Sequence, residues 1–301
     1  MKVLSFGSLN IDHNYKLDHI VAPGETISAH ELIVTCGGKG LNQSIALSKA
    51  GAEVWHAGMI GQDGMALKQM LDDAHVNTSI LKIDPDHPSG HTIIQIEEGT
   101  AQNCIIVHPG TNGLVDKDYI HDVVSHFEAG DYAVFQNEIS NVDYAMKCCR
   151  EKGLKVVFNP SPMTRELAAS DIYQYVDELF INEVEGGQMT GRSDPEEILQ
   201  EMKRLWPSCR TILTLGSDGA VVLAEGEYIY QKAFPCEAVD TTGAGDTFSG
   251  FFVALSAAGR DLREVLELSC KASSLAVRKM GAAASIPTLQ EVLTTKFQPA
   301  G

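Results

Sequence analysis

Residues 240–248 read DTTGAGDTF, and the apolar segment FSGFFVALSAAG that begins at Phe248 predicts a helix. Gly243, Ala244 and Gly245 place only small groups at the start of that helix, so their backbone N–H groups stay uncovered. Because first-turn N–H groups have no partner within a helix and the helix dipole is positive there, this start favours an anion. Asp246 lies in the same turn, where a carboxylate suits a general base that takes a proton from a hydroxyl attacking a phosphate. The alternative is a glycine-rich turn in which Asp246 only caps the helix.

Around this stretch, short apolar segments alternate with segments of helical periodicity. Strands are expected at 2–8, 54–61, 132–136, 155–160, 178–182 and 211–216, and helices at 40–51, 65–75, 142–153, 194–206, 246–258 and 261–280. Nearly continuous apolar strands alternating with helices indicate a mostly parallel sheet covered on both faces. The predicted fold is therefore a three-layer, doubly wound α/β domain spanning residues 1–301, with ligands at the carboxyl ends of its strands.

Two segments break this alternation. Residues 14–36 and 89–108 show partial period-2 patterning without helical spacing, so we expect antiparallel strands that project from the main sheet. Both segments lie next to candidate substrate residues. They form either a small β-lid that excludes water during phosphoryl transfer or a sheet edge with no gating role.

Composition limits the partners and the compartment. The net charge of −17 argues against nucleic acid and anionic membranes as partners. The seven cysteines lack CxxC spacing, which is typical of reduced cytoplasmic thiols rather than of disulfides or a zinc site. No apolar run approaches the ~18 residues that span a membrane, and the N-terminus does not resemble a signal peptide.

Several polar groups follow the predicted strands. GGKG at 37–40 opens the first strong helix with Lys39, and Asn42 lies three residues later. The segment is neither a P-loop nor a GxGxxG motif, and it could also be a flexible turn that caps the helix. Asn10 and Asp12 follow the first strand, and Glu138 follows the strand YAVFQ. An amide and carboxylates in such places suit the hydroxyls of a polyol, although Asn10 and Asp12 could equally form an Asx turn.

Two further strand ends are ambiguous. Glu185 in NEVE could order Mg²⁺ near phosphates, or it could be a solvated helix start. TLGSDG at 214–219 could hold the edge of a nucleotide or merely reverse the chain.

The order and spacing of these motifs resemble the ribokinase-like (PfkB) family of carbohydrate kinases over nearly the whole chain. The motifs that carry the resemblance are Asn10–Asp12, Gly37–Gln43, Gly58–Gly64, Glu138, Asn159–Pro162, Asn182–Glu185, Thr214–Gly219 and Asp240–Phe248. The family fold, a sheet of about eight or nine strands flanked by helices with a small β-lid, is in line with the predicted pattern.

The resemblance implies a role for each matching residue. Asp246 would be the general base, with Gly243, Ala244 and Gly245 as the anion hole for the transferring phosphoryl group. The sugar would be held by Asn10, Asp12, Gly38, Lys39, Asn42, Glu138 and Asp246. ATP would contact Asn182, Thr214, Ser217, Gly219 and Gly245, and Glu185 would act on Mg²⁺ indirectly. A K⁺ loop would comprise Asp240, Thr242, Ala276, Lys279, Gly281 and Ser285, although Lys279 departs from the arginine often found there.

The implied activity is ATP-dependent phosphorylation of a sugar, with D-ribose converted to D-ribose 5-phosphate. The match in type of all the sugar positions favours ribose, whereas Ile11, His13 and Leu41 differ from what is expected near a ribose pocket. The alternatives are kinases of the same family for deoxyribose, another pentose, a ketose or a nucleoside. A sensing module without turnover is a more distant alternative, and the missing GxGxxG weakens a NAD-dependent dehydrogenase. The resemblance also implies a homodimer that forms through the lids.

Overall fold

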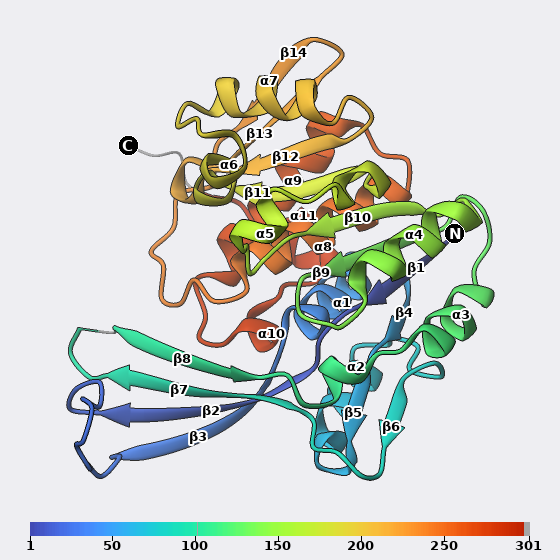
Figure 1. Cartoon of the computed structure of the whole chain (residues 1–301). Coiled ribbons are helices and arrows are strands. Elements are labelled where there is room, and N and C mark those ends of the chain that lie inside the picture. Colours follow the sequence, from blue (N-terminus) through green and yellow to red (C-terminus); the bar gives the residue numbers. More distant parts are fainter. Residues whose placement is uncertain (101, 298–301) are drawn as a thin grey trace.

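A computed structural model describes residues 1–100 and 102–297 of the chain. Its central sheet has the strand order β14-β13-β12-β11-β10-β9-β1-β4 (Figure 1). The strands are β1 (Lys2–Phe6), β4 (Glu53–Ala57), β9 (Tyr132–Gln136), β10 (Lys155–Asn159), β11 (Glu178–Asn182), β12 (Arg210–Thr214), β13 (Ala220–Ala224) and β14 (Glu227–Gln231). Every pairing is parallel except those of β13 with β12 and with β14. The predicted mostly parallel sheet is confirmed, and an antiparallel hairpin that the sequence did not predict extends one edge.

Helices cover both faces of this sheet because successive side chains of each strand point to opposite faces. On β9, Val134 enters one hydrophobic core, whereas Ala133 and Phe135 enter the other. The first core is closed by α1 (Lys39–Lys49), α2 (Met65–Asp73), α8 (Ala244–Ala257), α9 (Leu262–Ala276), α10 (Ala282–Ser285) and α11 (Leu289–Thr294). The second is closed by α3 (Lys117–Ser125), α4 (Val142–Lys152) and α7 (Pro195–Leu205). The short helices α5 (Arg165–Ala168) and α6 (Glu183–Thr190) follow β10 and β11. Two cores separated by one sheet confirm the predicted three-layer α/β fold.

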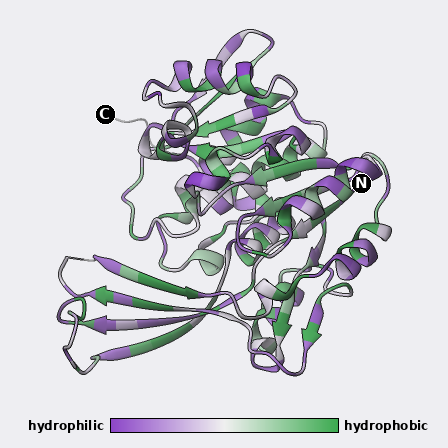
Figure 2. Ribbon diagram, in the orientation of Figure 1, coloured by the Kyte–Doolittle hydropathy of each residue, from purple (hydrophilic) through white to green (hydrophobic). Residues whose placement is uncertain are grey.

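A second sheet projects from this body as a four-stranded arm (Figure 1), which we call the lid. Its strands, in spatial order, are β3 (Glu31–Gly37), β2 (Asn10–Leu17), β7 (Gly90–Glu97) and β8 (Asn103–His108). The lid has apolar positions along its strands, as Figure 2 shows. Within the chain segments predicted to form it, Ala101 lies outside the described residues, as do residues 298–301 of the predicted domain.

The sequence prediction for the lid was wrong in two respects. The neighbouring strands β2 and β7 are parallel, not antiparallel, because both leave the body at the same end while β3 and β8 return to it. The lid also starts at Asn10 rather than at residue 14, since β2 begins four residues after the end of β1. Asn10 and Asp12 therefore belong to the lid itself.

The base of the lid is tied to the body through the GMIGQDG segment, residues 58–64. This segment includes β5 (Met59–Gly61), which pairs with β6 (Lys82–Asp84). Asp63 Oδ1 accepts hydrogen bonds from the backbone N–H of Ser89 at 2.9 Å and from its hydroxyl at 2.7 Å. Since Ser89 directly precedes β7, these bonds fix the point where the outgoing strand leaves the body.

Among the described residues, no helix combines the length and the apolar character required to cross a membrane.

Candidate active site

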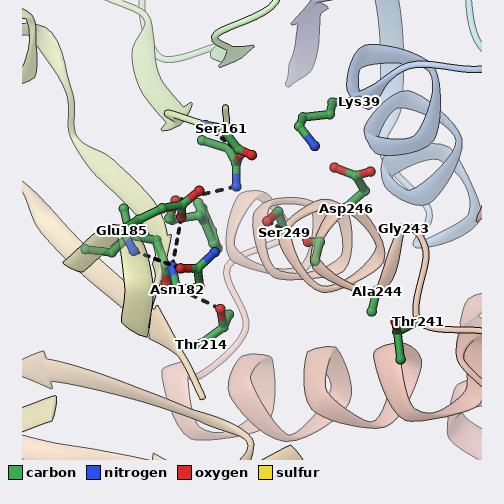
Figure 3. Close-up of a pocket in the computed structure, with 14 residues that line it drawn as sticks. Lys39, Ser161, Asn182, Glu185, Thr214, Thr241, Gly243, Ala244, Asp246 and Ser249 are labelled. Atoms are coloured by element: carbon green, nitrogen blue, oxygen red, sulfur yellow. Dashed lines mark hydrogen bonds between the residues drawn. The ribbon is translucent and has the colours of Figure 1, made fainter. Parts of the chain in front are cut away.

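A cavity of about 210 Å³ lies at the carboxyl ends of β10, β11 and β12, beside the start of α8 (Figure 3). Its walls include predicted site residues from four parts of the chain: Lys39, Asn182, Glu185, Thr214, Gly243, Ala244, Gly245 and Asp246. The remaining predicted sugar residues lie outside this lining: Asn10, Asp12, Gly38, Asn42 and Glu138. Both Asn42 and Glu138 are hydrogen-bonded to lining residues, Asn42 as a donor to Asp246 and Glu138 as an acceptor from Lys39.

The start of α8 leaves backbone donors without partners. Gly243 precedes the helix with φ of 73°, and a Cβ there would lie 2.8 Å from that of Ala282, so the turn requires glycine. The N–H of Ala244 donates to the carbonyl of Thr241 at 3.2 Å. Within the described ranges, the N–H groups of Gly245 and Asp246 have no acceptor. A Cβ at Gly245 would meet no atom within 4 Å, so the space before this turn is open. Open space and unpaired donors are what an anion site requires.

The carboxylate of Asp246 is nearly buried, with 9% of the residue exposed. Its Oδ2 accepts a hydrogen bond from Asn42 Nδ2 and its Oδ1 one from Gln43 Nε2, both at 3.0 Å. Both amides lie on α1, which packs closely against α8 because Gly250 has no side chain: a Cβ there would be 2.4 Å from that of Ala46. Packing of the two helices thus joins the motif around residue 40 to the motif around residue 245. The sequence analysis gave no role to Gln43, although it lies in the GGKGLNQ motif.

Lys39 begins α1 directly after Gly38, whose φ is 99°. A Cβ on Gly38 would lie 2.8 Å from the carbonyl oxygen of Ser8, so the helix can start this close to β1 only with glycine. Burial acts to lower the pKa of Lys39, but the charges of Asp246, Glu138 and Glu185 outweigh it and the pKa is raised. The ammonium therefore stays charged, and Figure 3 shows it beside the carboxylate of Asp246.

Glu138 holds the loop after β1 against the start of α1. Its Oε2 accepts hydrogen bonds from the hydroxyl of Ser8 and from the N–H of Lys39, the latter at 3.2 Å. Burial raises the pKa of Glu138, although the charge of Lys39 opposes the shift. The carboxylate thus lies against the start of α1, beside the lining residue Lys39.

Asn10 and Asp12 lie on the lid strand β2. The Oδ1 of Asn10 accepts from Asn112 Nδ2 at 2.9 Å, so its own amide N–H groups are left to donate elsewhere. Asp12 Oδ1 accepts from the hydroxyl of Thr92 at 2.6 Å, across the β2–β7 pair. Burial raises the pKa of Asp12 above its ordinary value. Asn112 and Thr92 were missed by the sequence analysis, because no local pattern links residues 80 or more positions apart.

Asn182 and Glu185 form a capping box at the start of α6. The Oδ1 of Asn182 accepts from the N–H of Glu185, and Glu185 Oε2 accepts from the N–H of Asn182, both at 2.9 Å. Glu185 therefore does cap a helix, as one interpretation of the sequence had it. It is not solvated, however, because it is 7% exposed and lines the cavity. Burial raises its pKa.

One end of the TLGSDG segment lines the cavity, and the rest of the segment reverses the chain. Thr214 lines the cavity, whereas Ser217 is exposed in the turn after β12 and is not among the lining residues. Gly219 has φ of 105°, and a Cβ there would lie 2.0 Å from the carbonyl oxygen of Gln231. This glycine is required by the β12–β13 reversal. Roles of Ser217 and Gly219 toward a nucleotide stay predictions.

The predicted cation loop is brought together from two segments. Asp240 Oδ1 accepts from the N–H and hydroxyl of Thr242, at 2.9 and 2.6 Å, and its Oδ2 accepts from the N–H of Gly281 at 2.8 Å. Burial acts to raise the pKa of Asp240, but these hydrogen bonds outweigh it and the pKa is lowered. The N–H of Lys279 donates to the carbonyl of Ala276, and the hydroxyl of Ser285 to that of Ala282. Hydrogen bonds of Asp240 therefore join the segment before α8 to the segment around Gly281.

In the part of the chain that the structure describes, no group of three or more His, Cys, Asp or Glu side chains is arranged to hold a metal ion.

Known proteins share both the sequence and the fold. The profile of the pfkB family carbohydrate kinases matches residues 1–289. Ribokinase of Bacillus subtilis is 32% identical, with 95% of this chain and 96% of the relative covered. Ribokinase from Cryptococcus neoformans, solved in complex with ADP, is 32% identical with a TM-score of 0.85, covering 97% and 98% of the two chains. Ribokinase of Arabidopsis thaliana, complexed with ribose and ATP, is 29% identical with a TM-score of 0.84, covering 97% of each chain.

Proposed function

The chain belongs to the pfkB family of carbohydrate kinases and is an ATP-dependent enzyme of that class, and we propose that its acceptor is D-ribose. In the proposed reaction, Asp246 takes the proton of the sugar 5-hydroxyl as the hydroxyl oxygen forms a bond to the γ-phosphorus. The bond from this phosphorus to the β–γ bridging oxygen breaks, and ADP leaves with the electron pair. The products are D-ribose 5-phosphate and ADP.

One observation carries this mechanism: a nearly buried carboxylate lies in the same helical turn as unpaired backbone donors. The N–H groups of Gly245 and Asp246 have no acceptor among the described residues, the space around a Cβ on Gly245 would be open, and Lys39 supplies positive charge nearby. Preorganised donors of this kind stabilise the charge on a transferring phosphoryl group, and catalysis of phosphoryl transfer rests mostly on positioning and electrostatics.

The proposed sugar side consists of Asn10 and Asp12 on the lid, and Asn42 and Glu138 on the body. Together they offer amide donors and carboxylate acceptors, as hydroxyl groups require. The three departures noted in the sequence do not weigh against ribose. Ile11 and His13 flank Asp12 on β2 and so point to the opposite face of the lid, and Leu41 is fully buried in the core. The relative from Arabidopsis thaliana was solved with ribose and ATP, which supports the same pair of substrates here.

Two cations belong to the proposal. Mg²⁺ would neutralise charge on the phosphates, with Glu185 acting through water, since its carboxylate lines the cavity. K⁺ would be held by the loop of Asp240, Thr242, Ala276, Lys279, Gly281 and Ser285, and its charge would favour anion binding at the start of α8.

All seven cysteines are free, which is consistent with the cytoplasmic location predicted from the sequence. We also propose a homodimer that forms through the lids.

Replacing Asp246 with Asn tests the reaction. The variant keeps the shape of the side chain but cannot take the proton, and general-base contributions are typically ~10²–10⁴-fold in rate. We expect turnover to fall by that order while binding of sugar and ATP, measured by calorimetry, changes little. Normal turnover in the purified variant would refute the assignment of Asp246.

The acceptor is tested by ADP release from the wild-type enzyme across pentoses, hexoses and nucleosides, with and without K⁺. D-ribose should give the highest kcat/KM. A higher kcat/KM with deoxyribose, another pentose, a ketose or a nucleoside would show that this compound, and not ribose, is the preferred acceptor. ADP release with none of these acceptors would favour a sensing module.

A further inference from the structure

A chain of two buried amides ends on the carboxylate of Asp246. Gln43 Nε2 donates to Asp246 Oδ1 at 3.0 Å, and Gln136 Nε2 donates to Gln43 Oε1 at 2.7 Å. Both glutamines are 0% exposed. Gln43 lies on α1, and Gln136 is the last residue of the central strand β9. The chain therefore connects the candidate base to the carboxyl end of the sheet.

The charge of Asp246 fixes the orientation of both amides. An ionised carboxylate only accepts hydrogen bonds, so Gln43 must present its N–H group to it. The carbonyl of Gln43 then faces Gln136, which must donate in turn. The reverse orientation of either amide would bring two oxygen atoms together. The two side chains thus form one ordered unit whose direction is set at the carboxylate.

The last member of the chain is left incompletely satisfied. Gln136 Oε1 is buried without a hydrogen-bond partner among the described residues. A Cβ on Gly7 would lie 2.0 Å from this oxygen, so the room for it exists only because residue 7 is glycine. A buried polar atom of this kind is unfavourable for folding, and an apolar side chain of similar size would avoid it only by leaving Gln43 Oε1 without its donor. What glutamine at position 136 adds is therefore the hydrogen bond to Gln43.

We propose that Gln43 and Gln136 are positioning residues for Asp246, an inference that rests on the proposed role of Asp246 as the general base. Gln136 holds the amide of Gln43 in one orientation, and Gln43 holds Oδ1 and favours the charged carboxylate. Asn42 binds Oδ2, so the plane of the carboxylate is fixed from both sides. With this plane fixed, the proton acceptor is aimed at the sugar hydroxyl before the substrate arrives, and no reorientation is needed during transfer.

Substitution of Gln43 by Leu separates positioning from packing. Leucine keeps the core filled but cannot donate, so the carboxylate can rotate. We expect kcat to fall about 10- to 100-fold, because small errors of placement have effects of this size. The KM values of sugar and ATP should stay within about threefold.

Ser44→Ala is the matched control. Ser44 follows Gln43 on α1, is equally buried, and its hydroxyl pairs with Nδ1 of His56 at 2.8 Å, away from Asp246. The Ser44→Ala variant should have a lower melting temperature but an unchanged kcat. If Gln43→Leu behaves like this control, Gln43 is only structural and the proposal is overturned.

A second substitution tests the relay even if Gln43→Leu folds poorly. Gln136→Leu removes one unsatisfied oxygen but leaves Gln43 Oε1 without its donor, so its melting temperature is measured together with kcat. It should still lower kcat several-fold, because Gln43 loses its orienting donor. The double variant should be no slower than Gln43→Leu alone, since residues that act as one unit are not additive. Wild-type kcat in Gln136→Leu, or effects that multiply in the double variant, would contradict the relay.

Asp246→Asn, measured in parallel, separates the two proposals. If it retains turnover, the general base is wrong and the relay has no function. If it loses turnover while Gln43→Leu keeps wild-type kcat, only the relay is wrong.

Discussion

At position 245, an added Cβ would meet no atom within 4 Å apart from its chain neighbours and the backbone of its own helix, although that helix is mostly buried. Gly245→Ala should therefore fold well, and its melting temperature should hold or rise, because alanine favours a helix over glycine by about 1 kcal/mol. The methyl group would occupy the space proposed for the phosphoryl group, so kcat should fall ~10²–10³-fold, as when one oxyanion-hole donor is lost. The control is Gly250→Ala on the same helix, whose Cβ would lie 2.4 Å from that of Ala46 and should lower the melting temperature. Wild-type kcat in Gly245→Ala would place the phosphoryl group elsewhere.

Among the elements, the lid strand β2 carries Asp12, the proposed acceptor of a sugar hydroxyl. Asp12→Ala removes a partly buried acceptor, which leaves a sugar hydroxyl unpaired at a cost of roughly 1–3 kcal/mol. The KM of the sugar should rise about 5- to 150-fold at that cost, while the KM of ATP changes little. Thr92→Val is the control, because it removes the hydroxyl donor to Asp12 at 2.6 Å but keeps the β-branched shape of the strand. If Asp12→Ala raises both KM values equally, Asp12 is structural or the pocket lies elsewhere.

For the whole molecule, the lid exposes apolar side chains on both of its faces. Val34, Ile105, Ile106 and Val107 are 53–61% exposed, and a surface of this kind favours association. Light scattering at micromolar concentration should give twice the 32.5 kDa of the single chain. Ile105 and Ile106 are neighbours on β8 and point to opposite faces, so their joint replacement by Lys should give the single-chain mass. The control Leu293→Lys, at an exposed apolar position on α11, should leave the measured mass at twice that of the single chain. A single-chain mass for the wild type, or a dimer that survives both lysines, would contradict assembly through the lid.

The sequence by itself determined the layers of the fold and the start of α8. Strands such as YAVFQ are buried along their whole length, and the helices between them show their own periodicity, so neighbouring residues alone indicate a covered parallel sheet. The small residues before Asp246 likewise form a local pattern, and Gly243 does adopt the left-handed conformation that only such a residue allows readily. The edge hairpin of β13 and β14 was missed, because its outer strand is only partly buried and lacks a continuous apolar run.

Only the tertiary structure decided which residues meet. Asp246 binds Asn42 and Gln43 across more than 200 positions, and Asn112 holds Asn10 across 102. The parallel pairing of β2 with β7, and the structural requirement for glycine at 219, were decided in the same way. Periodicity reports which face a side chain occupies on its own element, whereas these contacts depend on how distant elements pack against each other. The order of residues along the chain does not show which distant elements pack together. These contacts could therefore be identified only after the fold had brought the strand ends side by side.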